Sequence, residues 1–110
     1  MIFDKEGNTT IVYQEKITLG KFLKNLNAAY PRLKDDQLII NLFSFSSLTA
    51  NDILEFLNIS NKHRSRRKSF VLVTGKVPYD EVPDEICVVP TIQEARDIIE
   101  MEEIERDLEI

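Results

Sequence analysis

The residues most able to do chemistry lie in the stretch SFSSLTANDILEF, at positions 44–56. Ser46, Ser47 and Thr49 stand just ahead of a predicted helix N-terminus, where backbone N–H groups attract anions. One interpretation is a loop that is phosphorylated or handles phosphate. The other is a turn that leads into a well-capped helix, with Thr49 and Asp52 spaced as in a capping box. A carboxylate at Asp52 would repel an incoming phosphate, so the capping interpretation is preferred.

A second candidate is the basic run KHRSRRK at positions 62–68. Concentrated positive charge of this kind can contact RNA or an acidic protein face. Alternatively, the cations end a helix, where they complement its dipole and face water. No alternating glycine and aromatic residues accompany the run, which favours the structural interpretation and leaves the binding one open.

Other catalytic chemistry has little support in the sequence. The single histidine, His63, sits among cations, and no cysteine cluster or H-x-E pattern accompanies it, so we expect no metal site. Glycine-rich phosphate loops and the G-x-S-x-G nucleophile motif are absent. Four carboxylates between positions 80 and 85 could form an acid/base pair or bind Mg²⁺, but nothing near them is catalytic in type, so a solvated acidic loop is the preferred interpretation. We therefore expect no enzymatic activity and no cofactor.

The acidic stretch EMEEIERDLEI at positions 100–110 leaves two alternatives open. It is either a solvated helix face or an acidic helix that binds a partner.

The elements that must position these residues follow from hydrophobic periodicity and turn chemistry. A hairpin is expected over residues 2–15, with its turn at Glu6-Gly7-Asn8. A helix should begin after Thr18 and end before Pro31, because the residue preceding proline avoids the helical region. Near-continuous apolar runs at 37–43, 69–73 and 86–89 predict buried strands, and helices should begin at Thr49 and after Thr91, the latter reaching about residue 108. A loop with at most one helical turn is expected over 74–85.

The last helix should present one apolar face to the rest of the protein. Ile92, Ala95, Ile98 and Ile99 begin that face, and we expect Met101, Ile104 and Leu108 to continue it.

The order of elements, β-β-α-β-α-β-β-α, predicts an α/β fold. Strands that alternate with helices give a largely parallel sheet, and the N-terminal hairpin adds an antiparallel edge. A chain of 110 residues without a linker or repeat should form a single domain over 1–110. The lone Cys87 excludes an internal disulfide and, with its apolar neighbours, is expected to be a buried thiol in a reducing compartment.

Composition limits the partners and the location. The net charge of −5 argues weakly against a general nucleic-acid binder. The N-terminus lacks the pattern of a signal peptide, and no apolar run is long enough to span a bilayer, so a cytoplasmic protein without membrane contact is expected.

The middle of the chain, LIINLFSFSSLTANDILEFL followed by a basic helix end and SFVLV, resembles the STAS domain family. That family includes anti-sigma factor antagonists and the cytoplasmic domains of anion transporters. Asn41-Leu42 matches the family's strand end, Leu48 the apolar residue before its Asp-Ser-Ser-Gly-Leu motif, and Ile53 the leucine of that motif. Upstream, VYQEKITLGKFLKNL resembles the family's strand, turn and first helix; downstream, TIQEARDII resembles its last helix. The resemblance implies helices packed mainly on one side of the sheet.

The departures from this family concern its phosphorylated serine. The motif aspartate falls on Thr49, its two serines on Ala50 and Asn51, and its glycine on Asp52. In the switching members of the family, a serine at this place is phosphorylated by a partner kinase. Neither serine position carries a hydroxyl here, so the resemblance implies a regulatory domain without the usual phospho-switch. Ser46, Ser47 and Thr49 remain as shifted candidates for phosphorylation.

A second resemblance is to small proteins that carry the label ribonuclease Z. It rests on AYPRLKDDQLIINLF, EFLNISNKHR and IIEMEEIERDL. True ribonuclease Z enzymes use an H-x-H-x-D-H two-metal motif, which a chain with one histidine cannot supply.

Two functional hypotheses follow. The first is a non-enzymatic STAS-like domain that acts by protein–protein contact, and the second is an accessory to RNA processing that binds RNA through the basic run. Under the first, the expected partner-binding residues are Ser46, Ser47, Thr49, Asn51, Asp52, Lys62, Arg64, Arg66 and Arg67. The oligomeric state is left open.

Overall fold

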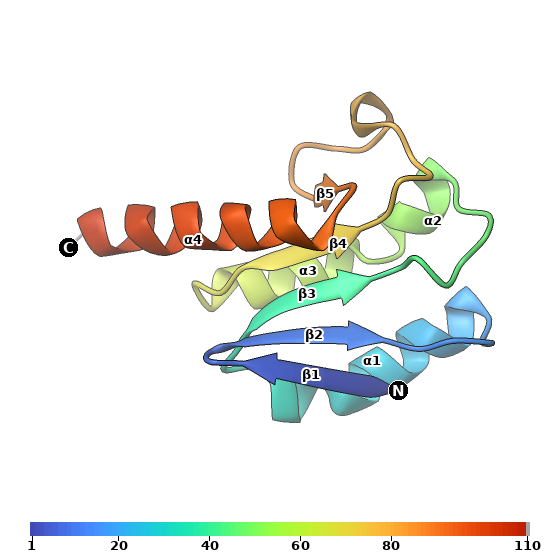
Figure 1. The fold of residues 1–110 in the computed structure, drawn as a ribbon, viewed down its shortest axis with the longest axis horizontal. Helices are drawn as coiled ribbons and strands as arrows, with labels where there is room; N and C mark the ends of the chain where they lie inside the picture. The colour runs from blue at the N-terminus through green and yellow to red at the C-terminus, as the bar shows by residue number, and fades with distance from the viewer. Residues whose placement is uncertain (110) are drawn as a thin grey trace.

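The computed structural model describes residues 1–109, and its five strands form one sheet whose spatial order follows the sequence (Figure 1). The first two strands are antiparallel and the remaining neighbours are parallel, which confirms the predicted α/β fold and its order of elements. No helix among these residues is both long and apolar enough to cross a bilayer. The elements are β1 (Ile2–Glu6), β2 (Thr9–Tyr13), α1 (Leu19–Leu33), β3 (Gln37–Asn41), α2 (Ala50–Leu54), α3 (Leu57–Ser65), β4 (Phe70–Val73), a 3-10 turn (Tyr79–Glu81), β5 (Cys87–Val89) and α4 (Ile92–Leu108).

The hairpin forms where the sequence predicts it. Glu6 pairs with Thr9, which leaves a two-residue connection. Gly7 occupies its first position with a φ of 62°. A positive φ at that position is what a type II′ hairpin turn requires, and glycine adopts it without steric cost.

Alternate residues of the central strands build two separate cores, one on each face of the sheet. On one face, Val12, Ile40 and Leu72 pack with residues of α1, α2 and α3. On the other, Ile39 and Val71 pack with residues of α4. Three helices therefore cover one face and α4 covers the opposite face (Figure 1).

Pro31 does not end the first helix, contrary to our expectation. The helix continues to Leu33, and Pro31 lies inside it. Only one backbone hydrogen bond is lost so close to the helix end, while Leu33 gains a buried position in the core. Tyr30, the residue that should avoid the helical conformation, is itself buried in that core.

The helix expected from Thr49 to the basic run is two helices. Backbone N–H groups of Glu55 and Phe56 donate to carbonyls three residues earlier, at Asp52 and Ile53, and this tighter turn separates α2 from α3. Ile53, Phe56 and Ile59 are all buried at a spacing of three. In an uninterrupted α-helix that spacing would turn Ile59 well away from Ile53, so the break serves the core.

The outer half of α4 also differs from our expectation. Met101 and Ile104 are 56% and 53% exposed, and Leu108 is 80% exposed, so they do not continue the apolar face. At 3.6 residues per turn, these three side chains lie on roughly the opposite side of the helix from the buried Ala95 and Ile99.

A buried histidine joins the helices on the first face. His63 is fully buried, and its Nε2 lies 2.7 Å from the carbonyl oxygen of Asp36. A carbonyl only accepts, so Nε2 carries the proton and donates. Nδ1 then accepts from the hydroxyl of Tyr30, also at 2.7 Å. This pair of bonds connects α3 to α1 and to the turn that precedes β3.

Burial lowers the pKa of His63 to about 4, with the neighbouring cations adding to the effect. Burial also disfavours the charged form of Tyr30, and this raises the pKa of its hydroxyl. Both groups therefore stay neutral near neutral pH, as their hydrogen bonds require.

We predict that the imidazole of His63, the sole histidine, titrates near pH 4 in the folded chain. An unfolded histidine titrates near 6.5, so between these values only the unfolded state takes up the proton. The histidine's contribution to stability is complete above pH 6.5 and declines as the pH falls toward 4, by about 3 kcal/mol at most. NMR titration of the ring signals measures the pKa directly, and a midpoint between 6 and 7 would contradict the buried network.

Candidate functional site

The segment between β3 and α2 leaves the sheet at the carboxyl ends of the parallel strands. Asn41 closes β3, and its Oδ1 accepts a hydrogen bond from the backbone N–H of Phe43 at 3.0 Å. The next residue, Leu42, is fully buried and donates its N–H to the carbonyl of Val73. These bonds turn the chain sharply outward and fix the start of the segment.

Two further contacts hold the segment in place. Ser44 Oγ donates to the carbonyl of Gln14 at 2.7 Å, which ties the segment to the loop after β2. Phe45 packs edge-on against Phe22 of α1, with ring centroids 5.5 Å apart. The segment is therefore anchored on both sides of its exposed residues.

The capping box at the start of α2 is confirmed. Thr49 Oγ1 accepts from the backbone N–H of Asp52 at 3.2 Å, and the carboxylate of Asp52 accepts from the N–H of Thr49 at 2.9 Å. The Thr49 hydroxyl is thus engaged in capping, and the helix N-terminus already holds an anion. A phosphate on Thr49 would lie beside that carboxylate.

The segment and the helix α2 that follows it each expose one large apolar side chain. Phe43 is 53% exposed and Leu54 is 41% exposed. The hydroxyl and amide residues expected at a binding surface lie on the same stretch and are also exposed. We call this set the β3–α2 surface; it comprises Phe43, Ser46, Ser47, Thr49, Asn51 and Leu54.

The sequence does not indicate that Phe43 and Leu54 belong to this surface. Phe43 belongs to the apolar run that predicts a strand, but it lies two residues beyond the last residue of β3. Leu54 falls outside the spacing of three that joins the buried Ile53, Phe56 and Ile59. This difference in spacing is the one sign in the sequence that Leu54 is exposed.

Two hollows among residues 1–109 lie beside residues that the sequence analysis considered. The hollow beside the β3–α2 surface is about 250 Å³ and is lined by residues that include Tyr13, Glu15 and Phe43. A larger one of about 680 Å³ runs along β5 past Cys87, whose thiol is half-buried. Burial raises the pKa of that thiol, which disfavours the nucleophilic thiolate. Among residues 1–109, no three metal-ligating side chains come together.

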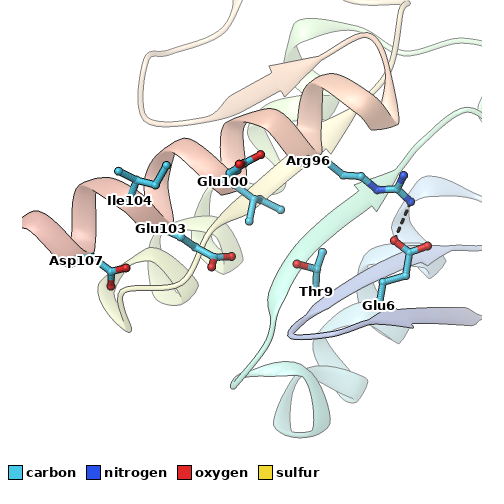
Figure 2. A pocket seen from close by; sticks show the side chains of 8 residues that line it. Glu6, Thr9, Arg96, Glu100, Glu103, Ile104 and Asp107 are labelled. Carbon is cyan, nitrogen blue, oxygen red and sulfur yellow. Dashed lines mark hydrogen bonds and ion pairs between the residues drawn. The ribbon is translucent and has the colours of Figure 1, made fainter.

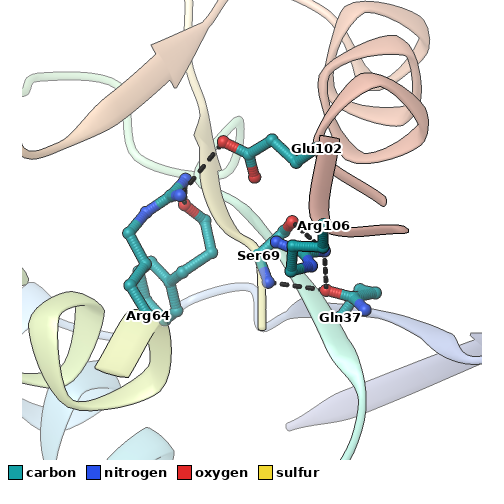
Figure 3. Close-up of polar contacts among 6 residues, drawn as sticks. Gln37, Arg64, Ser69, Glu102 and Arg106 are labelled. Carbon is teal, nitrogen blue, oxygen red and sulfur yellow. Dashed lines mark hydrogen bonds and ion pairs between the residues drawn. The ribbon is translucent and has the colours of Figure 1, made fainter. Parts of the chain in front are cut away.

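The basic run is largely engaged within the chain. Arg64 Nη1 lies 3.0 Å from Glu102 of α4, and its Nη2 donates to the carbonyl of Phe70 at the start of β4 (Figure 3). Arg64 thereby reaches from α3, on one face of the sheet, to α4 on the other. Both side chains of the ion pair are more than two-thirds buried.

The neighbouring cations make more exposed contacts. Arg66 pairs with Asp35 at 3.0 Å and donates to the carbonyl of Lys34, while Arg67 pairs with Glu109 at 3.0 Å. Lys62 Nζ lies 4.9 Å from the centre of the Tyr30 ring.

A second arginine contact secures α4. Arg106 Nη2 donates to Ser69 Oγ at 3.1 Å and to Gln37 Oε1 at 3.3 Å (Figure 3). The same Gln37 oxygen accepts the backbone N–H of Ser69 at 2.6 Å. This partly buried cluster links the first residue of β3, the approach to β4 and the outer half of α4.

The structure thus divides the predicted partner-binding residues into two groups. Ser46, Ser47, Thr49, Asn51 and Asp52 come together on one segment, with Asp52 half-buried in its capping role. The cations of the basic run lie on α3 and just after it, in contacts with α1, β4 and α4. A comparison with protein-family models finds no match to this chain, and a search of curated proteins finds none either.

We predict that Arg64→Met destabilises the chain by about 1–3 kcal/mol, because Glu102 and the Phe70 carbonyl then lose a charged donor while largely buried. Arg67→Ala is the matched control; its ion pair is about 60% exposed on each side, so its loss should cost less than about 1 kcal/mol. Urea unfolding monitored by circular dichroism measures both. Equal losses of unfolding free energy in the two variants would show that the largely buried ion pair of Arg64 stabilises the fold no more than the exposed pair of Arg67.

Proposed function

We propose that this chain is a non-enzymatic, cytoplasmic, STAS-like regulatory domain that acts by protein–protein contact through the β3–α2 surface. The observation that supports it most is the exposure of Phe43, on a segment fixed by hydrogen bonds, and of Leu54, at the end of the capped helix α2. Exposed large apolar side chains lose unfavourable hydration when a partner covers them. A fixed segment also loses little conformational entropy on binding.

The polar members of the surface complete the proposal. Ser46, Ser47 and Asn51 are exposed and lie between the two apolar positions in the sequence, so they can supply polar contacts beside them. In the STAS family the corresponding strand–helix loop carries the regulatory serine. Here Ala50 and Asn51 stand at those positions, so we propose that recognition depends on shape and neutral polar contacts, without a phospho-switch.

The alternative, an RNA-binding accessory associated with ribonuclease Z, has less support. Arg64, Arg66 and Arg67 each pair with a carboxylate of the same chain. An RNA phosphate would have to compete with those carboxylates for the guanidinium groups. The net charge of −5 also disfavours binding to the phosphates of RNA.

We predict that the double variant Phe43→Asp and Leu54→Asp loses its partner. The tagged wild-type chain is used to capture proteins from native extract, which are identified and quantified by mass spectrometry. A captured protein should fall at least about tenfold with the double variant, because buried unpaired carboxylates are costly at an interface. Ile2→Asp, at a 50% exposed position on β1, is the matched control and should capture the same protein.

Two results would contradict the proposal. In one, the captured proteins are unchanged by the double variant although the chain is folded. In the other, ribonuclease treatment abolishes capture, which would support the RNA-binding alternative.

A further inference from the structure

Helix α4 is longer than the strands of the sheet that it covers. Its 17 residues extend about 25 Å, whereas the longest strands have five residues and extend about 17 Å. Its buried residues, Ala95 and Ile99, both lie in its first half. Figure 1 shows the C-terminal half of α4 continuing past the amino ends of the parallel strands.

An apolar stripe lies on the solvent side of this outer half. Met101, Ile104 and Leu108 are each more than half exposed, and helical geometry places them within about 60° of one another around the axis. We call these three residues the α4 stripe. Exposed large apolar side chains are otherwise few among residues 1–109, so three on one helix face form a distinct feature.

Acidic side chains border this stripe on both sides. Glu100, Glu103 and Asp107 form one border, and Glu105 lies on the other. The first three also line a groove of about 340 Å³ between α4 and the turn of the β1–β2 hairpin (Figure 2).

The groove carries an excess of negative charge. Across it, Glu6 is paired with Arg96 at 2.9 Å, which neutralises that carboxylate. No ion pair among residues 1–109 involves Glu100, Glu103 or Asp107.

The charge pattern selects the occupant of this face. A second copy that packed stripe to stripe would set carboxylates against carboxylates, and an anionic bilayer would be repelled in the same way. A helix that carries apolar residues every three or four positions and cations beside them complements both features. We propose that the α4 stripe and its acidic border dock a basic amphipathic helix of a partner protein.

This docking face is separate from the β3–α2 surface. α4 begins at the carboxyl end of β5 and runs back toward the amino ends of the strands, so the two surfaces lie at opposite ends of the sheet (Figure 1). The chain would then connect two partners.

The test uses a fluorescently labelled synthetic helix of about 16 residues, with leucine at every third or fourth position and lysine elsewhere. Binding to the full chain is followed by anisotropy. Two double variants, Ile104→Gln with Leu108→Gln and Glu103→Lys with Asp107→Lys, should each weaken binding at least about tenfold. Glu55→Lys with Glu81→Lys, at two exposed positions away from α4, makes the same change in total charge and should change affinity less than about twofold. Circular dichroism confirms that each variant is folded.

The controls separate docking from general charge attraction. A peptide of the same composition without an apolar stripe, and one with glutamate in place of lysine, should bind at least about tenfold more weakly. Equal binding of the first of these, unchanged affinity in both double variants, or no binding by the wild type would overturn the proposal. So would a dimer of the chain, seen by sedimentation, that Ile104→Gln dissociates.

The variant Phe43→Asp with Leu54→Asp should leave peptide binding intact. Loss of peptide binding therefore reports on the α4 stripe alone, and loss of the captured protein reports on the β3–α2 surface.

Discussion

The hydrogen bonds of one buried imidazole determine how the middle of this chain is arranged. His63 must remain neutral to accept from Tyr30 and donate to the carbonyl of Asp36, and its burial keeps it so. With His63 directed into the core, the helix that carries it has a fixed rotation. Arg64 is then directed to Glu102 and the Phe70 carbonyl, while Arg66 reaches Asp35. Charges that could bind a nucleic acid instead join the two layers of helices and support the ends of the strands.

Local patterns were sufficient to predict most of the fold. The hairpin turn at Gly7, the buried strands and the capped starts of the helices depend on neighbouring residues, so they could be read from short windows of sequence. The errors occurred where distant contacts outweigh local preference. Pro31 lies inside α1 because Tyr30 and Leu33 are buried, and the helix after Thr49 divides so that Phe56 can enter the core.

The candidate site was only partly predictable for the same reason. The hydroxyl residues and the capping box were evident from their spacing, whereas the carboxylate partners of Arg64, Arg66 and Arg67 lie 31 to 42 positions away in the chain. The exposure of Phe43 and Leu54 depends on where β3 ends and on where α2 gives way to α3. The side of α4 on which Met101 and Ile104 lie could have been derived from helical geometry, given that Ala95 and Ile99 pack against the sheet.

We propose that the β3–α2 surface is the contact face, whereas the basic run stabilises the fold. Hydrogen–deuterium exchange tests it most directly, with the chain measured alone and in complex with its captured partner. Slower exchange over residues 43–54 in the complex, with no change over 62–68, is the result that the claim predicts. Slower exchange confined to 62–68, with 43–54 unchanged, would contradict it.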